Sequence, residues 1–177
     1  GLCCYLNSSP IVRNVTIRNN TSNWQGGGIY CYYNSNPTIS NVSIKSNTVS
    51  GDGGGVSIDE SSPIIENSVI SSNSSNSGGG MMYGGGAEPI LINVTITGNT
   101  ASTTAGGIHC YSSSNPILIN CILRDNSPDE IVIDSGSLTI TYSDIQGGYT
   151  GTGNIDADPL FCNPDSGDYT LAENSPC

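Results

Sequence analysis

Residues 36–47 read "NPTISNVSIKSN", and reworded copies of this phrase occur four more times in the chain. Aligned on their prolines, successive copies begin 27, 26, 26 and 27 residues apart. A period this regular predicts a solenoid, in which every repeat stacks on its neighbours. The other four copies are residues 9–20, 62–73, 88–99 and 115–126.

Each copy carries an apolar residue two positions after its proline and another seven positions after it. Two short strands joined by a bend would turn both positions toward a core. The first set is Val12, Ile39, Ile65, Leu91 and Leu118. The second set is Ile17, Ile44, Ile70, Ile96 and Leu123.

Two columns of asparagine accompany these apolar positions. We predict that the first column forms the bend and points inward, where amides stacked about 4.8 Å apart bond to one another as a ladder. It lies four positions after each proline and comprises Asn14, Asn41, Asn67, Asn93 and Asn120. We predict that the second column marks the exit from the strand, because asparagine tolerates left-handed backbone angles. It comprises Asn20, Asn47, Asn73, Asn99 and Asn126.

After each second asparagine come a loop of variable length and a glycine cluster: "GGGIYC", "GGGVSI", "GGGMMY" or "GGIHC". Glycine permits a tight corner, and the alternation that follows it predicts a third strand with one face toward the core. We therefore predict an all-β right-handed parallel β-helix of about six rungs, each of about 26 residues with three short strands. We expect residues 1–148 to form the rungs and residues 149–177 to form an irregular acidic tail.

The alternation of "GGGI" with the proline phrase resembles right-handed parallel β-helix repeat proteins of microbial surfaces, and overlaps the repeats of polymorphic outer-membrane proteins. The tail "GNIDADPLFCNPDSGDYTLAENSPC" is similar to the segment that closes many such secreted proteins. The resemblance implies the fold and an extracellular or cell-surface location. It implies no activity, because the same superfold carries pectate lyases, adhesins and proteins without known chemistry.

Composition narrows the partners and the compartment. The net charge is −11 with four Lys and Arg residues in all, which argues against binding nucleic acid. Ten of the fifteen carboxylates lie from Asp125 onward, so the last third of the chain is acidic and the repeated part before it is nearly neutral. The chain contains no run of eighteen apolar residues, so no transmembrane segment is predicted. Seven cysteines without a CxxC pair favour an oxidising compartment over a zinc site.

An enzyme that cleaves polysaccharide on this fold needs carboxylates converging from neighbouring rungs. The acidic residues of the repeats stand at five different positions relative to the prolines. They are Asp52, Asp59, Glu60, Glu66 and Glu88. We therefore predict no catalytic residues and a structural or adhesive role. The alternatives are a fragment of a carbohydrate-active enzyme and a glycan-binding module without turnover.

Two outward columns are candidate contact surfaces. Arg18, Lys45 and Arg124 occupy the same position in their repeats. They are either solvent-exposed strand residues or a binding surface for an anionic glycan. A second column stands beside inward cysteines, and its aromatic rings either stack on one another or bind sugar or protein. It comprises Tyr5, Tyr32 and Tyr111.

We expect a disulfide between Cys162 and Cys177, which are close in sequence within the tail. Cys4 and Cys31 occupy one inward column of adjacent rungs, where either a disulfide or two buried thiols would fit. Because the number of cysteines is odd, at least one thiol is free or bonded to another chain. Cys3 is the candidate for the bond to another chain.

The tail also holds four aspartates with the oxygen ligands that calcium takes, although their spacing is not that of an EF-hand loop. Asx turns alone explain the same residues, and we expect no cofactor. The four are Asp156, Asp158, Asp165 and Asp168.

Seven Asn-x-Ser/Thr sequons occur. Asn7 and Asn19 are expected in turns or outward positions, where they are open to glycosylation. Asn14, Asn41 and Asn93 are expected to point inward and to be closed to it.

The chain also starts in phase with the repeat, which leaves two readings: residues before Gly1 have been lost, or the open end docks on another molecule and builds filaments head to tail.

Overall fold

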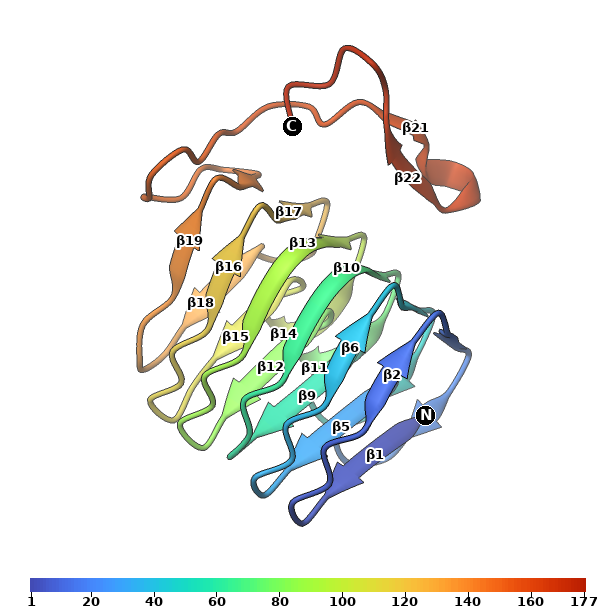
Figure 1. Ribbon diagram of the computed structural model, residues 1–177, viewed down its shortest axis with the longest axis vertical. Helices are drawn as coiled ribbons and strands as arrows, with labels where there is room; N and C mark the ends of the chain where they lie inside the picture. The colour runs from blue at the N-terminus through green and yellow to red at the C-terminus, as the bar shows by residue number, and fades with distance from the viewer.

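The structure is a computed structural model that describes residues 1–177. It is a right-handed parallel β-solenoid of about six coils, which confirms the predicted fold class (Figure 1). Three sheets run along the axis, and every pairing within them is parallel. Sheet A contains β1 (Leu2–Tyr5), β5 (Ile29–Tyr32), β9 (Val56–Asp59), β12 (Met81–Gly84), β15 (Ile108–Cys110) and β18 (Ile131–Ile133).

Sheet B is formed by the proline phrases, and each rung enters it as two short strands or as one long bent strand. Its strands are β2 (Ile11–Arg13), β3 (Thr16–Arg18), β6 (Thr38–Ser40), β7 (Ser43–Lys45), β10 (Ile64–Ser71), β13 (Ile90–Thr97), β16 (Ile117–Ile119), β17 (Ile122–Arg124), β19 (Thr139–Thr141) and β20 (Asp144–Ile145). Sheet C is short and lies in the segment predicted as a variable loop. It contains β4 (Thr21–Ser22), β8 (Thr48–Val49), β11 (Ser74–Ser77) and β14 (Thr100–Thr104).

The core is a set of straight apolar stacks along the axis. Ile44, Ile70 and Ile96 pair in register through β7, β10 and β13, and all three are fully buried. Sheet A contributes alternate residues, so that Ile29 and Cys31 are buried, as the alternation predicted. The predicted inward positions of both apolar sets therefore belong to one core cluster or pack against it.

The first asparagine column is on the outside, and the prediction that it points inward is wrong. All five residues have left-handed backbone angles, with φ between 50° and 55°, and all five are exposed. Asparagine adopts this conformation more readily than most residues, so here it makes the bend between the two strands of sheet B. Part of the column still forms an outer amide row, in which Asn93 donates to Asn67 over 2.9 Å and Asn120 donates to Asn93 over 2.7 Å.

The buried ladder is formed by the second asparagine column. The side-chain amide of Asn47 donates to Oδ1 of Asn73 and to the carbonyl of Ile17, both over 3.0 Å. The backbone N–H of Asn47 donates to the same Oδ1 over 3.0 Å. Asn73 repeats this pattern toward Asn99, so that each amide in the buried rungs has both its donors and its acceptor satisfied.

The glycine corner exists because of this ladder. A Cβ on Gly55 would lie 2.6 Å from the carbonyl oxygen of Gly80, 2.7 Å from a methyl group of Ile70 and 3.0 Å from Nδ2 of Asn73. The corner glycine, the stacked isoleucine and the ladder asparagine therefore occupy one tightly packed layer in each rung. Only a residue without a side chain fits at that place.

The ladder ends on Glu130, a residue that the repeat pattern did not single out. The backbone N–H of Asn126 donates to Oε1 of Glu130 over 3.0 Å, and the side-chain amide donates to Oε2. A carboxylate suits this position because both of its oxygens accept, whereas another asparagine would need a further rung. Burial raises the pKa of Glu130, and the hydrogen bonds from Asn126 oppose that shift.

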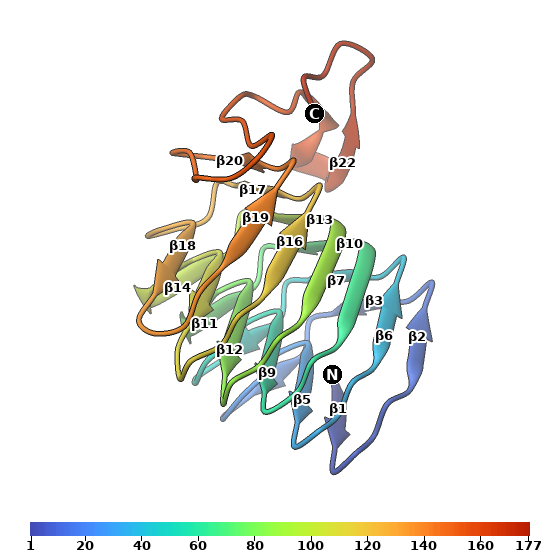
Figure 2. The same ribbon diagram turned by 60° about the vertical axis from the view of Figure 1, so that its left-hand side comes forward.

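The stack continues beyond residue 148, where the rungs were expected to end. Ile145 donates its N–H to the carbonyl of Ile155, and Tyr142 donates to Thr152. The chain then forms an antiparallel hairpin of β21 (Phe161–Asn163) and β22 (Asp168–Leu171), joined by the 3₁₀ helix η1 (Pro164–Ser166). Figures 1 and 2 show the hairpin in red at the end of the stack opposite the N-terminus.

The two asparagine columns have separable roles that unfolding measurements distinguish. We expect Asn73→Ala to lower the free energy of unfolding by about 3 kcal/mol or more, because each buried group left unpaired costs about 1–3 kcal/mol. Asn41→Gly is the matched control, because it removes an exposed amide and keeps a residue suited to φ of 54°. Denaturant melts followed by circular dichroism give both values. A larger loss for Asn41→Gly would contradict the assignment.

Glu130 makes stability depend on pH with a definite sign. Its pKa in the folded protein is raised, so its contribution to stability is fully present below the pKa of the unfolded chain and is lost as pH rises through the folded value. Glu130→Gln does not titrate. We expect the stability of the wild type relative to this variant to fall as pH rises from about 4 to about 7. Denaturant melts across that range measure it, and a constant difference would contradict the prediction.

Candidate functional site

Sheet A carries, on the side away from the core, two columns of residues that alternate with the core-facing ones. Register places Tyr5 beside Tyr32, and Tyr32 beside Asp59 of the next rung. The first column, from the N-terminal rung onward, is Cys3, Tyr30, Ser57, Met82, His109 and Val132. The second column is Tyr5, Tyr32, Asp59 and Gly84, and backbone hydrogen bonds continue it to Tyr111 and Asp134.

Five aromatic side chains gather over β1 and β5, and we call them the aromatic patch. Tyr30 and Tyr32 are stacked, with ring centroids 5.8 Å apart and planes 7° from parallel. Tyr5 lies 5.6 Å from Tyr32, Tyr33 lies 5.9 Å from it, and Trp24 packs edge-on against Tyr30 at 5.8 Å. Trp24 is 68% exposed. Beside the patch lies a cleft of about 510 Å³ lined by Tyr5, Trp24 and Tyr30.

The sequence predicted part of this patch. Tyr5 and Tyr32 meet as expected, but Tyr111 lies apart because Asp59 and Gly84 occupy the two rungs between. The ring of Tyr111 covers Gly84, where a Cβ would lie 2.6 Å from the ring. Sequence reasoning missed Trp24, Tyr30 and Tyr33. The signal for Tyr30 was its position two residues before Tyr32, which places both on the same face of a strand.

Carboxylates border the patch and favour the protonated form of Tyr30 and Tyr32. Burial, followed by the charge of Asp59, raises the pKa of Tyr30. The charge of Glu60 is the largest cause that raises the pKa of Tyr32. Burial and then Glu60 raise the pKa of Asp59 itself. The patch therefore offers flat rings and hydroxyl donors beside negative charge, a combination that suits a neutral partner better than a polyanion.

His109 is held in a chain of polar contacts on the same face. Its Nδ1 lies 2.7 Å from Oγ of Ser77, and its Nε2 lies 2.9 Å from Oδ2 of Asp134. The Ser77 hydroxyl also lies 3.2 Å from the carbonyl of Thr104, and Ser77 is 6% exposed. This arrangement orients the imidazole beside Tyr111 and keeps the Ser77 hydroxyl buried.

Register places the predicted cationic column in one line, but the line is not an open cationic surface. Arg18 pairs with Lys45, which is followed by Ser71 and Thr97, and Arg124 follows Thr97. Ser71 and Thr97 are buried, each 3% exposed. Arg124 forms ion pairs within the chain. Within this column, Arg18 and Lys45 are the cations without an ion pair.

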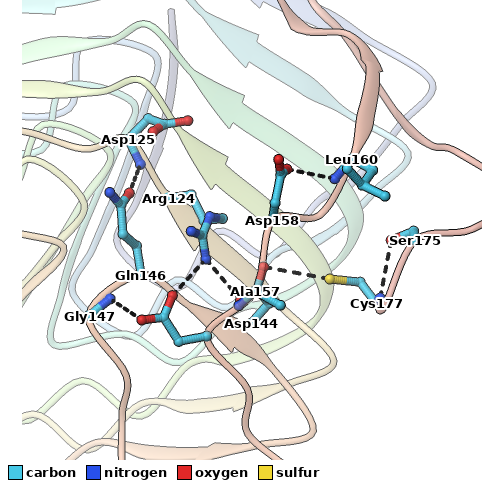
Figure 3. Close-up of polar contacts among 11 residues, drawn as sticks. Arg124, Asp125, Asp144, Gln146, Gly147, Ala157, Asp158, Leu160, Ser175 and Cys177 are labelled. Atoms are coloured by element: carbon cyan, nitrogen blue, oxygen red, sulfur yellow. Dashed lines mark hydrogen bonds and ion pairs between the residues drawn. The ribbon is translucent and has the colours of Figure 1, made fainter.

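Arg124 and Asp144 anchor the tail to the last rungs (Figure 3). The Asp144 side chain is 1% exposed and accepts from Nη1 of Arg124 and from the N–H of Ala157, both over 3.0 Å. The thiol of Cys177 lies 3.6 Å from its second oxygen. Arg124 also pairs with Asp156 over 3.0 Å, and Asp156 accepts from Gly147. A buried carboxylate is thus satisfied by three segments that are distant in sequence.

The four tail aspartates do not converge. Asp156 is paired with Arg124, Asp158 accepts from the backbone of Leu160, and Asp168 accepts from Thr170. Asp165 lies in η1. Nowhere do three or more His, Cys, Asp or Glu side chains come together as a metal site would require.

All seven cysteines are free thiols, so the expected disulfide between Cys162 and Cys177 is not formed. Cys177 lies against Asp144 instead of Cys162, because the tail is held by the Arg124 network. Cys4 and Cys31 are register partners in β1 and β5, as expected, and remain two buried thiols. A hydrogen bond between them lowers the pKa of Cys4 and raises that of Cys31. Cys3 is exposed.

The sequon positions differ from the prediction in one respect. Asn7 and Asn19 are exposed, with left-handed backbone angles. Asn14, Asn41 and Asn93 are exposed as well, so their expected closure to glycosylation is wrong. The physical reason is that the first asparagine column forms the exposed bends, whereas the second column forms the buried ladder.

Comparison with known families agrees with this geometry. Residues 28–154 match the family described as "Right handed beta helix region", and residues 14–32 match the "Chlamydia polymorphic membrane protein (Chlamydia_PMP) repeat". The first match covers well over half of the chain, and the chain therefore belongs to the right-handed β-helix family. Neither the curated proteins nor the solved structures gave a match. No helix here has the length and hydrophobicity needed to cross a bilayer.

The tail anchor depends on Asp144 more than on any exposed acid. We expect Asp144→Ala to lower the free energy of unfolding by about 2 kcal/mol, because it leaves the N–H of Ala157 without its acceptor and removes one of the two carboxylates paired with partly buried Arg124. It should also speed proteolysis within residues 149–177. Asp158→Asn is the control, because Asp158 lies outside the network. Limited proteolysis with mass spectrometry measures the effect, and equal cleavage rates for the two variants would contradict it.

Proposed function

We propose that this chain is a surface-associated structural β-solenoid that adheres to neutral carbohydrate through the aromatic patch, without turnover. The patch is the observation that carries the proposal. Four of its rings, Tyr5, Tyr30, Tyr32 and Trp24, form a continuous series of contacts on the outer face of a rigid sheet. Flat aromatic surfaces of this kind pack against the apolar C–H faces of sugar rings, and their hydroxyls bond to sugar oxygens.

The rigidity of the support favours binding. Tyr30 and Tyr32 stand on β5, which is paired on both sides, so their backbone positions are fixed before a ligand arrives. A preorganised site loses little conformational entropy when it binds. The neighbouring Asp59 and Glu60 disfavour acidic polysaccharides, which makes a neutral glycan the preferred partner.

The surface location rests on the repeat match, whose name is that of a membrane protein repeat. An extracellular or cell-surface position also accords with a fold that stabilises itself through repeated local contacts. End-to-end association into filaments stays a prediction, and electron micrographs of the purified protein test it.

An adhesive role predicts binding that depends on the patch. We expect the double variant Tyr30→Ala/Tyr32→Ala to lose at least tenfold in affinity for insoluble cellulose or chitin, a difference of about 1.4 kcal/mol. The control is Ile64→Ala, which removes an exposed apolar side chain from sheet B. Sedimentation binding assays measure retention, with pectin as an anionic comparison.

Two outcomes would overturn the proposal. Equal retention of the double variant and the wild type would show that the patch does not bind these polymers. Release of reducing sugars by the wild type would favour the carbohydrate-active enzyme over the adhesive role.

A further inference from the structure

A second cleft, of about 520 Å³, lies where the tail hairpin faces the outside of sheet B. The solenoid contributes Asn93, Asn120 and Tyr142 to its lining, and the hairpin contributes Tyr169 and Leu171. Its volume lies within the range of about 300–1,000 Å³ that small-molecule sites occupy. The aromatic patch is on sheet A, so this cleft is a separate feature of the molecule.

The outer amide row ends at this cleft. Asn120 donates to Asn93, but no group of the chain donates to Oδ1 of Asn120. The cause is in the sequence, because the next rung carries Tyr142 where the repeat would place another asparagine. The row therefore presents an unpaired amide acceptor at the edge of the cleft, directly beside an aromatic ring.

Tyr142 is held so that much of the residue stays exposed. It keeps the left-handed backbone angle of the asparagines it replaces, with φ of 52°. Part of the ring packs on Gly153, where a Cβ would lie 2.4 Å from the ring. The residue is nevertheless 62% exposed. Adjacent rungs are about 4.8 Å apart, so a ligand that contacts the exposed part of the ring lies within reach of Oδ1 of Asn120.

The charges around the cleft select an uncharged ligand. Its one side-chain carboxylate, that of Asp144, is already paired with Arg124 and bonded to the N–H of Ala157. Burial, followed by Asp144, raises the pKa of the Cys177 thiol, which therefore stays neutral. No free cation lines the cleft to hold a phosphate or a carboxylate.

We propose that this cleft binds one pyranose unit of a neutral saccharide. The apolar face of the sugar packs against the exposed part of the Tyr142 ring, and a sugar hydroxyl donates to Oδ1 of Asn120. Thr95 and Thr170 line the same cleft and offer further hydroxyl groups to the ring substituents. The site is independent of the adhesive function proposed for sheet A, and together the two would give the solenoid two separate contacts with carbohydrate.

Nuclear magnetic resonance on the full-length ¹⁵N-labelled chain tests this site. The probes are methyl β-D-glucopyranoside, methyl α-D-mannopyranoside and N-acetylglucosamine at millimolar concentrations. We expect at least one of them to shift the side-chain amide signals of Asn120 and Asn93 in a saturable way. The shifts should disappear in Tyr142→Ala, persist in Tyr142→Phe, and weaken at least fivefold in Asn120→Gly, which preserves the bend.

Tyr32→Ala is the control that separates this site from the patch. We expect it to leave the Asn120 shifts unchanged even if binding through the patch is lost. Backbone spectra show whether each variant is folded, and Tyr142→Phe keeps the test decisive if Tyr142→Ala is not. The proposal is overturned if none of the three sugars shifts Asn120, if Tyr142→Ala binds as the wild type does, or if the shifts fall only on residues of the patch.

Discussion

The buried ladder of side-chain amides is the constraint on which the rest of the structure depends. An asparagine inside the solenoid must satisfy two N–H groups and a carbonyl oxygen without water, and an identical asparagine one rung away does this for each neighbour. Asn73 illustrates the arrangement, with Asn99 of the next rung on one side and Asn47 and the carbonyl of Ile44 of the preceding rung on the other. An insertion or deletion between the proline and the ladder asparagine of any rung would move that asparagine out of line with its neighbours. This accounts for the constant spacing between the two residues in every copy.

The ladder also dictates the glycine corner and the end of the stack. Gly55 is required because the amide of Asn73, the methyl group of Ile70 and the next backbone leave no space for a side chain. Glu130 is suited to the last position because a carboxylate accepts two hydrogen bonds and needs no partner beyond it. The interior is therefore uniform, and differences between rungs are concentrated on the outer faces. Both candidate contact sites are found there.

The outer faces differ in how they are built. On sheet A, the aromatic patch follows from stacking within and between neighbouring rungs, with Tyr32 in contact with Tyr5 and Tyr30. At the far end of sheet B, the cleft exists only because the tail hairpin folds against the solenoid, and the Arg124–Asp144 pair secures the segment that leads to it. The first surface thus belongs to the repeat itself, and the second belongs to the join between repeat and tail.

The sequence by itself determined the period, the parallel fold, the inward aliphatic columns and the register of Tyr5 with Tyr32. These follow from local alternation and from the regular recurrence of one phrase. Tertiary structure decided which asparagine column lies inside, because asparagine is suited both to a left-handed bend and to an amide ladder, and the spacing fits either. It also decided the position of Trp24, the pairing of Arg124 with Asp144 and the fate of the cysteines. These depend on contacts between segments whose separation the repeat does not fix.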